Sequence, residues 1–268
     1  MPRAKISGHL CDYLTQGDPG GLPLVFIHGF PFSQATWTGQ LQALPPSVYA
    51  VTYDLRGLGQ SEATGGEVSM DGYADDLEGL LELLHIKRPI VCGLSMGGYV
   101  ALHAAARNPG LVRGLALCDT RSGADSVEAK AGRTSAAKQV RESGMESLVE
   151  AQLPNLMTPQ SFASDADWVQ ALRTIMLSTA PEGAAGALEA MRDRSDTTPA
   201  LARFDFPVQL IFGEHDKVTP PTEGQSMAAA LPDAQLAIIE GAGHVSNLEN
   251  PTQFNAALHS YLGQFLPA

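Results

Sequence analysis

"IVCGLSMGGYVALHAA", residues 90–105, changes character at a single serine. The apolar run before Ser95 is typical of a buried strand, and the small residues after it are typical of a helix. Gly93 and Gly97, two positions to either side, leave space for a turn too abrupt for residues with side chains. A strained turn that carries a hydroxyl indicates a functional site at Ser95.

Apolar runs of similar length recur along the chain and alternate with amphipathic segments. Two of these segments, 69–86 and 251–266, place apolar residues on one helical face. The residues before Leu22 are typical of an antiparallel hairpin at a sheet edge. The alternation predicts an α/β protein, a mostly parallel sheet flanked by helices. The strand-like runs are 22–29, 48–55, 88–95, 112–120, 208–216 and 234–244.

One long region interrupts this alternation. Residues 121–204 have a helical and polar composition with no strand-like run, and a bare loop of that length is uncommon. We therefore predict a core made of residues 1–120 and 205–268, with a helical cap at 121–204 mounted over the sheet. We expect the cap to shape a mostly apolar pocket. Trp168 is a candidate either to line this pocket or to pack in the core, and Arg121 is a candidate to bind the substrate.

The composition indicates an ordinary globular protein. Its 268 residues are 44% hydrophobic and carry a formal net charge of −12, which argues against nucleic acid or an anionic membrane as partner. Three cysteines without a CxxC pair predict neither a disulfide framework nor a metal site. No stretch approaches the roughly 20 apolar residues that span a bilayer, and no signal peptide is apparent. We expect a cytoplasmic enzyme without a cofactor, monomeric or homodimeric.

Polar residues at the carboxyl ends of the predicted strands are the candidates for a site. Ser95, Asp216 and His244 each lie at such an end. A serine hydroxyl is a weak nucleophile, so His244 would accept its proton and return it to the leaving group, while Asp216 would orient the imidazole. The oxyanion needs backbone donors, and we predict the N–H groups of Phe30 and Met96 for this role.

The sequence offers a second candidate for the acid. Asp119 also ends a strand-like run, in "LALCDT". We prefer Asp216 because the acid must lie beside the histidine loop. The other histidines are interpreted as scaffold or surface residues: His9 in the hairpin, His28 in the oxyanion loop, His85, His103 and His259 within helices, and His215 pointing away from the site.

These motifs resemble those of the α/β-hydrolase superfamily along nearly the whole chain. They are "HGFP" at 28–31, "DLRGLGQS" at 54–61, G-x-S-x-G at 93–97, "GEHDKVTP" at 213–220 and "GAGHVSNLENP" at 241–251. Within the superfamily, "CGLSMGG" and "RTIMLSTAPEGAAGALEAMRD" are similar to 3-oxoadipate enol-lactonases and small carboxylesterases. The resemblance implies an α/β-hydrolase fold and a serine hydrolase that cleaves an ester or lactone through an acyl-enzyme. It designates the same five residues, Ser95, Asp216, His244, Phe30 and Met96.

Substrate and reaction type stay open at this point. A doubly anionic substrate would need local cations, for which Arg121, Arg133 and Arg173 of the cap are candidates. The same scaffold hosts hydroxynitrile lyases and perhydrolases. A signalling or ligand-receptor protein with slow turnover is a third possibility, and an exposed apolar patch on the cap would favour it.

Overall fold

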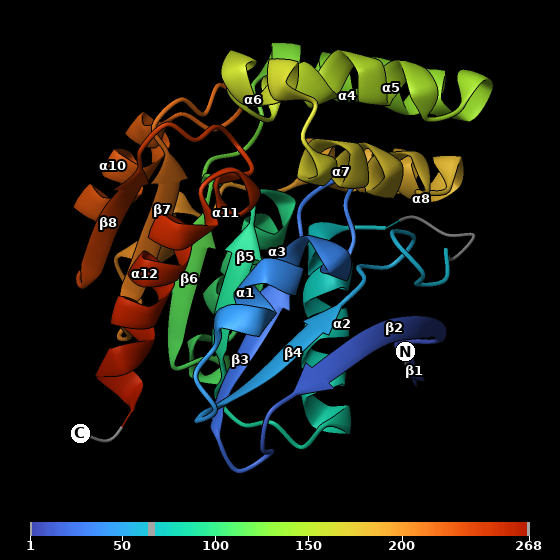
Figure 1. The fold of residues 1–268 in the computed structure, drawn as a ribbon. Helices are drawn as coiled ribbons and strands as arrows, with labels where there is room; N and C mark the ends of the chain where they lie inside the picture. Colours follow the sequence, from blue (N-terminus) through green and yellow to red (C-terminus); the bar gives the residue numbers. More distant parts are fainter. Residues whose placement is uncertain (1, 64–67, 267–268) are drawn as a thin grey trace.

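A single eight-stranded sheet lies at the centre of the computed structural model, which describes residues 2–63 and 68–266 (Figure 1). The strand order is β1-β2-β4-β3-β5-β6-β7-β8. The hairpin of β1 and β2 joins β4 in antiparallel pairing, and the other neighbours are parallel. This confirms the predicted sheet and its edge hairpin. The strands are β1 (Arg3–Ile6), β2 (His9–Gln16), β3 (Leu22–Ile27), β4 (Val48–Tyr53), β5 (Ile90–Leu94), β6 (Gly114–Cys118), β7 (Val208–Gly213) and β8 (Ala234–Ile239).

Helices cover both faces of the sheet. In Figure 1, α1 (Thr38–Ala43) and α12 (Pro251–Leu262) lie in front of the sheet, and α2 (Met70–Leu83) and α3 (Met96–Arg107) lie behind it. Helix α10 (Pro221–Ala230) packs against β7 and β8. Every residue of β4, β5, β6 and β7 is therefore buried. Burial on both faces explains why these strands read as continuous apolar runs.

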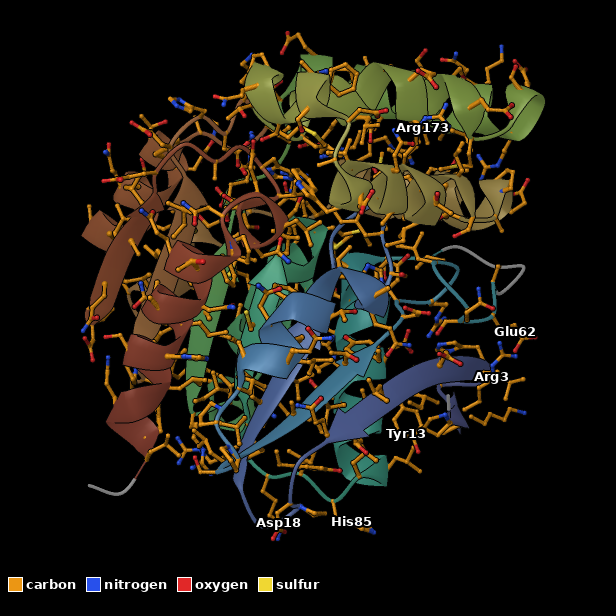
Figure 2. The ribbon with its side chains drawn as sticks, viewed as in Figure 1. Arg3, Tyr13, Asp18, Glu62, His85 and Arg173 are labelled. Carbon is orange, nitrogen blue, oxygen red and sulfur yellow. The ribbon has the colours of Figure 1, made fainter. Side chains whose placement is uncertain are left out.

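Two predicted helices end earlier in the structure than in the sequence analysis. Helix α2 stops at Leu83, so the prediction that His85 lies within a helix is wrong. His85 has a φ of 55°, which a helix does not allow, and it lies at the end of the sheet away from the cap (Figure 2). Helix α12 ends at Leu262, and a 3₁₀ turn follows it over Gly263–Phe265.

Helices fill the stretch between β6 and β7, and they stand over the carboxyl ends of the strands (Figure 1). Helices α4 to α6 form the outer layer of this stretch, and α7 and α8 lie between that layer and the sheet. We call residues 121–204 the cap; its division from a core of 1–120 and 205–268 stays a prediction, and residues 1, 64–67 and 267–268 of that core lie outside the described residues. The helices are α4 (Val127–Ser143), α5 (Glu146–Gln152), α6 (Pro159–Ser164), α7 (Asp167–Leu177), α8 (Pro181–Asp193) and α9 (Thr198–Leu201).

Among the helices within residues 2–63 and 68–266, none is both long enough and apolar enough to cross a lipid bilayer.

Candidate active site

Ser95 occupies a sharp turn between β5 and α3. Its φ of 52° and ψ of −114° are strained for a residue with a side chain. A Cβ on Gly93 would lie 2.4 Å from the carbonyl oxygen of Gly97, and one on Gly97 would lie 2.2 Å from that of Ile27. Both glycines are therefore required by close backbone approach. The N–H of Ser95 donates to the carbonyl oxygen of Cys118 at 2.9 Å, which ties the turn to β6.

The structure brings Ser95, His244 and Asp216 together although they are far apart in the sequence. The Nε2 atom of His244 lies 2.8 Å from Ser95 Oγ, and its Nδ1 atom lies 2.8 Å from Asp216 Oδ2. All three residues are buried. An ionised carboxylate only accepts hydrogen bonds, so we assign the proton to Nδ1. The lone pair of Nε2 then faces the serine hydroxyl, as a general base requires.

Several donors hold the carboxylate of Asp216 in its charged form. Oδ1 accepts the N–H groups of Val218 at 2.7 Å and Thr219 at 3.0 Å. Oδ2 accepts the Thr219 hydroxyl at 2.7 Å beside His244 Nδ1. Burial alone would raise the pKa of Asp216, but attraction to His244 and these hydrogen bonds outweigh it and hold the pKa below its usual range. The carboxylate is thus ionised at neutral pH.

The two predicted oxyanion donors are Met96, which follows Ser95 directly, and Phe30, which lies in the loop after β3. Met96 begins α3, where the first N–H groups of a helix have no partner within the helix. Phe30 lines the same cavity as Ser95. Among the described residues, no acceptor is assigned to the N–H of either residue. Both N–H groups are available to a developing oxyanion, and the helix N-terminus favours negative charge there.

Asp119, the alternative acid, does not contact His244. Its Oδ1 accepts the N–H of Gly213 at 2.7 Å, and its Oδ2 is hydrogen-bonded to the Ser246 hydroxyl. The side chain therefore ties the end of β6 to the end of β7 and to the loop that carries His244. Burial raises the pKa of Asp119 well above its usual range, and the charge of Asp216 raises it further. The Ser95–His244–Asp216 geometry favours Asp216 as the acid.

The raised pKa of Asp119 predicts a pH dependence of stability. The folded protein binds this proton more tightly than the unfolded chain, so the free energy of unfolding falls as pH rises above the ordinary Asp pKa of about 3.9. Asp119→Asn removes the titrating group, and its melting temperature relative to wild type should rise between acidic and neutral pH. Thermal melts over that range measure the difference. A difference independent of pH would contradict the raised pKa.

A cavity, about 340 Å³ in volume, opens above Ser95. Its lining is mostly apolar, as we expected, and it also includes two cations and two amides. Among the described residues, no carboxylate lines it, although the chain has a net charge of −12. The lining residues are Phe30, Ser95, Tyr99, Arg133, Gln152, Asn155, Leu156, Met191, Lys217, Val218 and His244.

One of the two cations is held by a buried ion pair network. Asp125 pairs with Arg133 and, at 2.7 Å, with Arg194. The Arg194 guanidinium also lies over the Tyr99 ring, 4.2 Å from its centre, within the range of a cation–π contact. One carboxylate faces two guanidinium groups here, so the network leaves a net positive charge beside the cavity.

Three expectations about the cap are not supported by the geometry. Trp168, at the start of α7, is half-buried against the core cluster and does not line the cavity. Arg121 does not line it either, because its guanidinium is bound by the carbonyl oxygen of Val218 and lies 3.6 Å from Glu223. Arg173 pairs with Glu150 of α5, between the layers of the cap (Figure 2).

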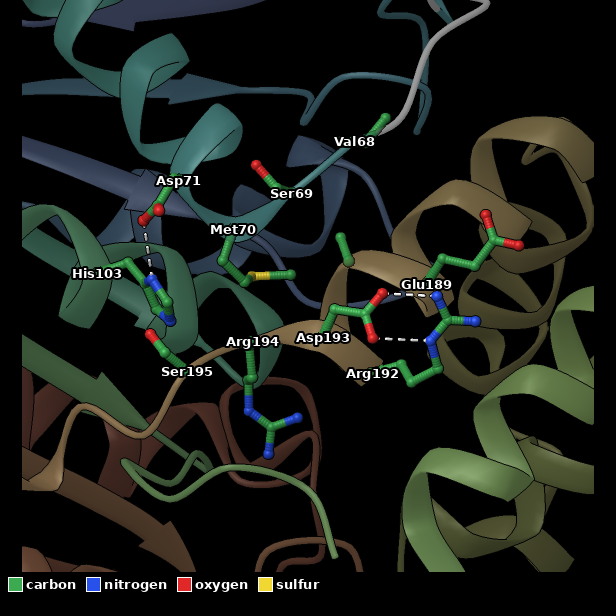
Figure 3. A pocket seen from close by; sticks show the side chains of 11 residues that line it. Val68, Ser69, Met70, Asp71, His103, Glu189, Arg192, Asp193, Arg194 and Ser195 are labelled. Atoms are coloured by element: carbon green, nitrogen blue, oxygen red, sulfur yellow. Dashed lines mark hydrogen bonds and ion pairs between the residues drawn. The ribbon is translucent and has the colours of Figure 1, made fainter. Parts of the chain in front are cut away.

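A second cavity, about 400 Å³ in volume, lies between α2, α3 and α8 and shares no lining residue with the first (Figure 3). His103 Nδ1 pairs with Asp71 there at 3.1 Å. Among the described residues, no serine hydroxyl is hydrogen-bonded to His103. This cavity thus lacks the nucleophile and base pairing seen at Ser95. Within the same residues, no group of three or more His, Cys, Asp or Glu side chains is arranged to hold a metal ion.

Sequence reasoning missed several residues that line the cavity or support it. Lys217 and Thr219 lie within the quoted motif "GEHDKVTP" and were overlooked although they flank the chosen acid. Tyr99 lies four residues after Ser95, so helical periodicity could have placed it on the same side of α3 as Ser95. Asn155 and Met191 carry no comparable signal, because only the packing of the cap brings them to Ser95.

The chain matches the family model described as alpha/beta hydrolase fold over residues 23–251, and it belongs to this family. It is 28% identical over 254 residues to 3-oxoadipate enol-lactonase 2 of Acinetobacter baylyi, covering 95% of this chain and 93% of the relative. A thermophilic esterase from Thermogutta terrifontis, solved with malate bound, superposes with a TM-score of 0.94 at 34% identity, covering 98% and 99% of the two chains.

The enol-lactonase from Burkholderia xenovorans is another similar structure. It superposes with a TM-score of 0.92 at 29% identity, covering 98% of this chain and 100% of that one. These similarities support a hydrolase of α/β fold and agree with the resemblance stated from the motifs.

Proposed function

We propose that the protein hydrolyses a carboxylic ester or lactone through an acyl-enzyme formed on Ser95. The observation that carries this proposal is the hydrogen-bonded chain from Ser95 Oγ through His244 to Asp216, with 2.8 Å at each step, on the wall of a cavity. Nucleophile, base and orienting group are thus within the reach that acyl transfer requires.

In the proposed reaction, each step is carried by one group. As Ser95 Oγ attacks the carbonyl carbon, its proton passes to His244 Nε2, and the N–H groups of Phe30 and Met96 stabilise the oxyanion. Collapse of the tetrahedral intermediate breaks the ester bond, and the leaving oxygen takes the proton from His244. A water molecule then attacks the acyl-enzyme with His244 again as base, which releases the acid and restores Ser95.

Rapid mixing with an activated aryl ester tests the acyl-enzyme directly. If acylation is faster than deacylation, product appears as a burst equal to the enzyme concentration, and quenched protein carries the acyl mass on the Ser95 peptide. A panel of esters and lactones at steady state ranks the substrates. Acylation at another residue would contradict the proposal, and so would a turnover far below about 1 per second on every substrate.

The cations of the cavity support a narrower substrate class, esters or lactones that carry a carboxylate. Lys217 is exposed at the cavity, and no ion pair is assigned to it among the described residues. Arg133 faces the same space with its Nε atom bound to Asp125. The similar esterase from T. terrifontis was solved with malate, a dicarboxylate.

Lys217→Gln is expected to lower kcat/KM about fivefold for an ester that carries a carboxylate, because an exposed charge contributes roughly 1 kcal/mol. For the matched ester in which a neutral carboxamide replaces that carboxylate, kcat/KM should stay unchanged. Raising the salt concentration should shrink the difference, since screening weakens the attraction. Kinetics with the two matched esters measure it. Lys138→Gln on the exposed face of α4 is the control; equal effects of both variants, or equal effects on both esters, would rule out a role for Lys217.

A further inference from the structure

Thr219 contacts both members of the acid–base pair. It is fully buried in the loop after β7, three residues beyond Asp216. Its hydroxyl oxygen lies 2.7 Å from Asp216 Oδ2 and 3.2 Å from His244 Nδ1. Its N–H donates to the other oxygen, Asp216 Oδ1, at 3.0 Å. One residue thus touches both carboxylate oxygens and the imidazole.

The direction of these hydrogen bonds follows from the donors present. The carboxylate only accepts, so the Thr219 hydroxyl donates its proton to Asp216 Oδ2. The Thr219 hydroxyl oxygen then presents a lone pair toward the Nδ1–H of His244. The Nδ1 proton is shared between Asp216 Oδ2 and this oxygen. The three groups form a closed ring that fixes the rotation of the carboxylate and of the imidazole together.

Each carboxylate oxygen is fixed by different donors. Oδ1 is held by the backbone N–H groups of Val218 and Thr219, which any residue except proline would supply at these positions. Oδ2 is held by the Thr219 hydroxyl and His244 alone among the described residues. Among the described residues, the Thr219 hydroxyl is therefore the one side-chain donor to Oδ2 other than His244, and it can hold Oδ2 in place against His244.

We propose that Thr219 is a positioning residue of the active site, whose hydroxyl holds Asp216 Oδ2 against His244 Nδ1 so that Nε2 faces Ser95. The proposal rests on the proposed function of the Ser95–His244–Asp216 group. Orientation matters most when His244 takes the serine proton, because the imidazolium then forms beside the carboxylate. The hydroxyl should consequently affect kcat more than KM.

Thr219→Val removes the hydroxyl and keeps the branched shape of the side chain. We expect kcat for an aryl ester to fall about tenfold with KM unchanged, the loss typical of one hydrogen bond to a charged group. Thr219→Ser keeps the hydroxyl and should recover kcat to within about threefold of wild type. In an Asp216→Asn background the valine substitution should have little further effect, since residues that act as a unit are not additive.

A matched control separates this role from packing. Thr197 is also buried, and its hydroxyl donates to the carbonyl oxygen of Ser122 at 3.0 Å, away from His244. Thr197→Val should lower the melting temperature without changing kcat. Equal losses of kcat in Thr219→Val and Thr219→Ser, or full activity in Thr219→Val, would overturn the proposal.

A readout independent of turnover distinguishes this proposal from the proposed function. The Nδ1 proton of His244 should give a downfield NMR signal in wild type and exchange with solvent faster in Thr219→Val. If no ester is hydrolysed and exchange still quickens, the proposed function fails and the positioning role of Thr219 stands. If exchange is unchanged, the positioning role is refuted whatever the activity.

Discussion

Ser95→Ala is expected to lower kcat by about 10⁶ on any ester that wild type hydrolyses, because the oxyanion donors and the cavity remain but no nucleophile does. An organophosphate should modify wild type at Ser95 and leave the variant unmodified. Folding should be preserved, because the one hydrogen bond assigned to the Ser95 hydroxyl among the described residues is to His244. Steady-state kinetics, mass spectrometry and thermal melts measure the three outcomes.

The control for Ser95→Ala is a buried serine outside the active site. Ser122 has the same exposed fraction as Ser95, 8%, and its hydroxyl lies 2.7 Å from that of Thr198. Ser122→Ala should lose some stability and keep its kcat. If Ser95→Ala retained activity while Ser122→Ala did not, the nucleophile would have to be sought elsewhere.

The sheet was predictable from the sequence because its strands are buried on both faces. Runs such as 208–213 are apolar except for Gln209, and such runs between amphipathic helices define a parallel sheet. The turn at Ser95 was predictable for a related reason. A Cβ atom at Gly93 or Gly97 would lie closer than 2.5 Å to a backbone oxygen. Only glycine fits at these positions, so the turn is recognisable from the sequence.

The surroundings of the site were harder to predict, because they depend on how the cap packs. Nothing in the local sequence distinguishes Arg133, which faces the cavity, from Arg173, which pairs with Glu150. The sequence left Trp168 open between the pocket and the core, and its position on α7 directs it to the core cluster. Long-range packing, unlike backbone strain, has no short sequence pattern.

Asp216→Asn is expected to lower kcat by about 10⁴, the loss known for the same Asp-to-Asn change in a serine protease with a Ser-His-Asp triad. The asparagine amide can donate to His244 Nδ1, which favours the tautomer protonated at Nε2. That tautomer cannot accept the Ser95 proton. The backbone donors of Val218 and Thr219 can still bind the amide oxygen, so the fold and the loop should be retained.

Asp119→Asn is expected to lower kcat less than about tenfold, because the neutral amide can reproduce most of what a protonated carboxyl does there. Its oxygen can accept the N–H of Gly213 as the carboxyl does now. Its NH₂ group can keep a hydrogen bond to Ser246 with the direction reversed, since the Ser246 hydroxyl now donates to Asp119 Oδ2. The two variants should therefore differ by about 10³ in kcat, roughly 4 kcal/mol of transition-state stabilisation. Parallel kinetics with melting temperatures decide the question. If Asp119→Asn were the more damaging while both proteins stayed folded, the acid that orients His244 would lie at the end of β6, and the hydrogen bond between Asp216 and His244 would be structural.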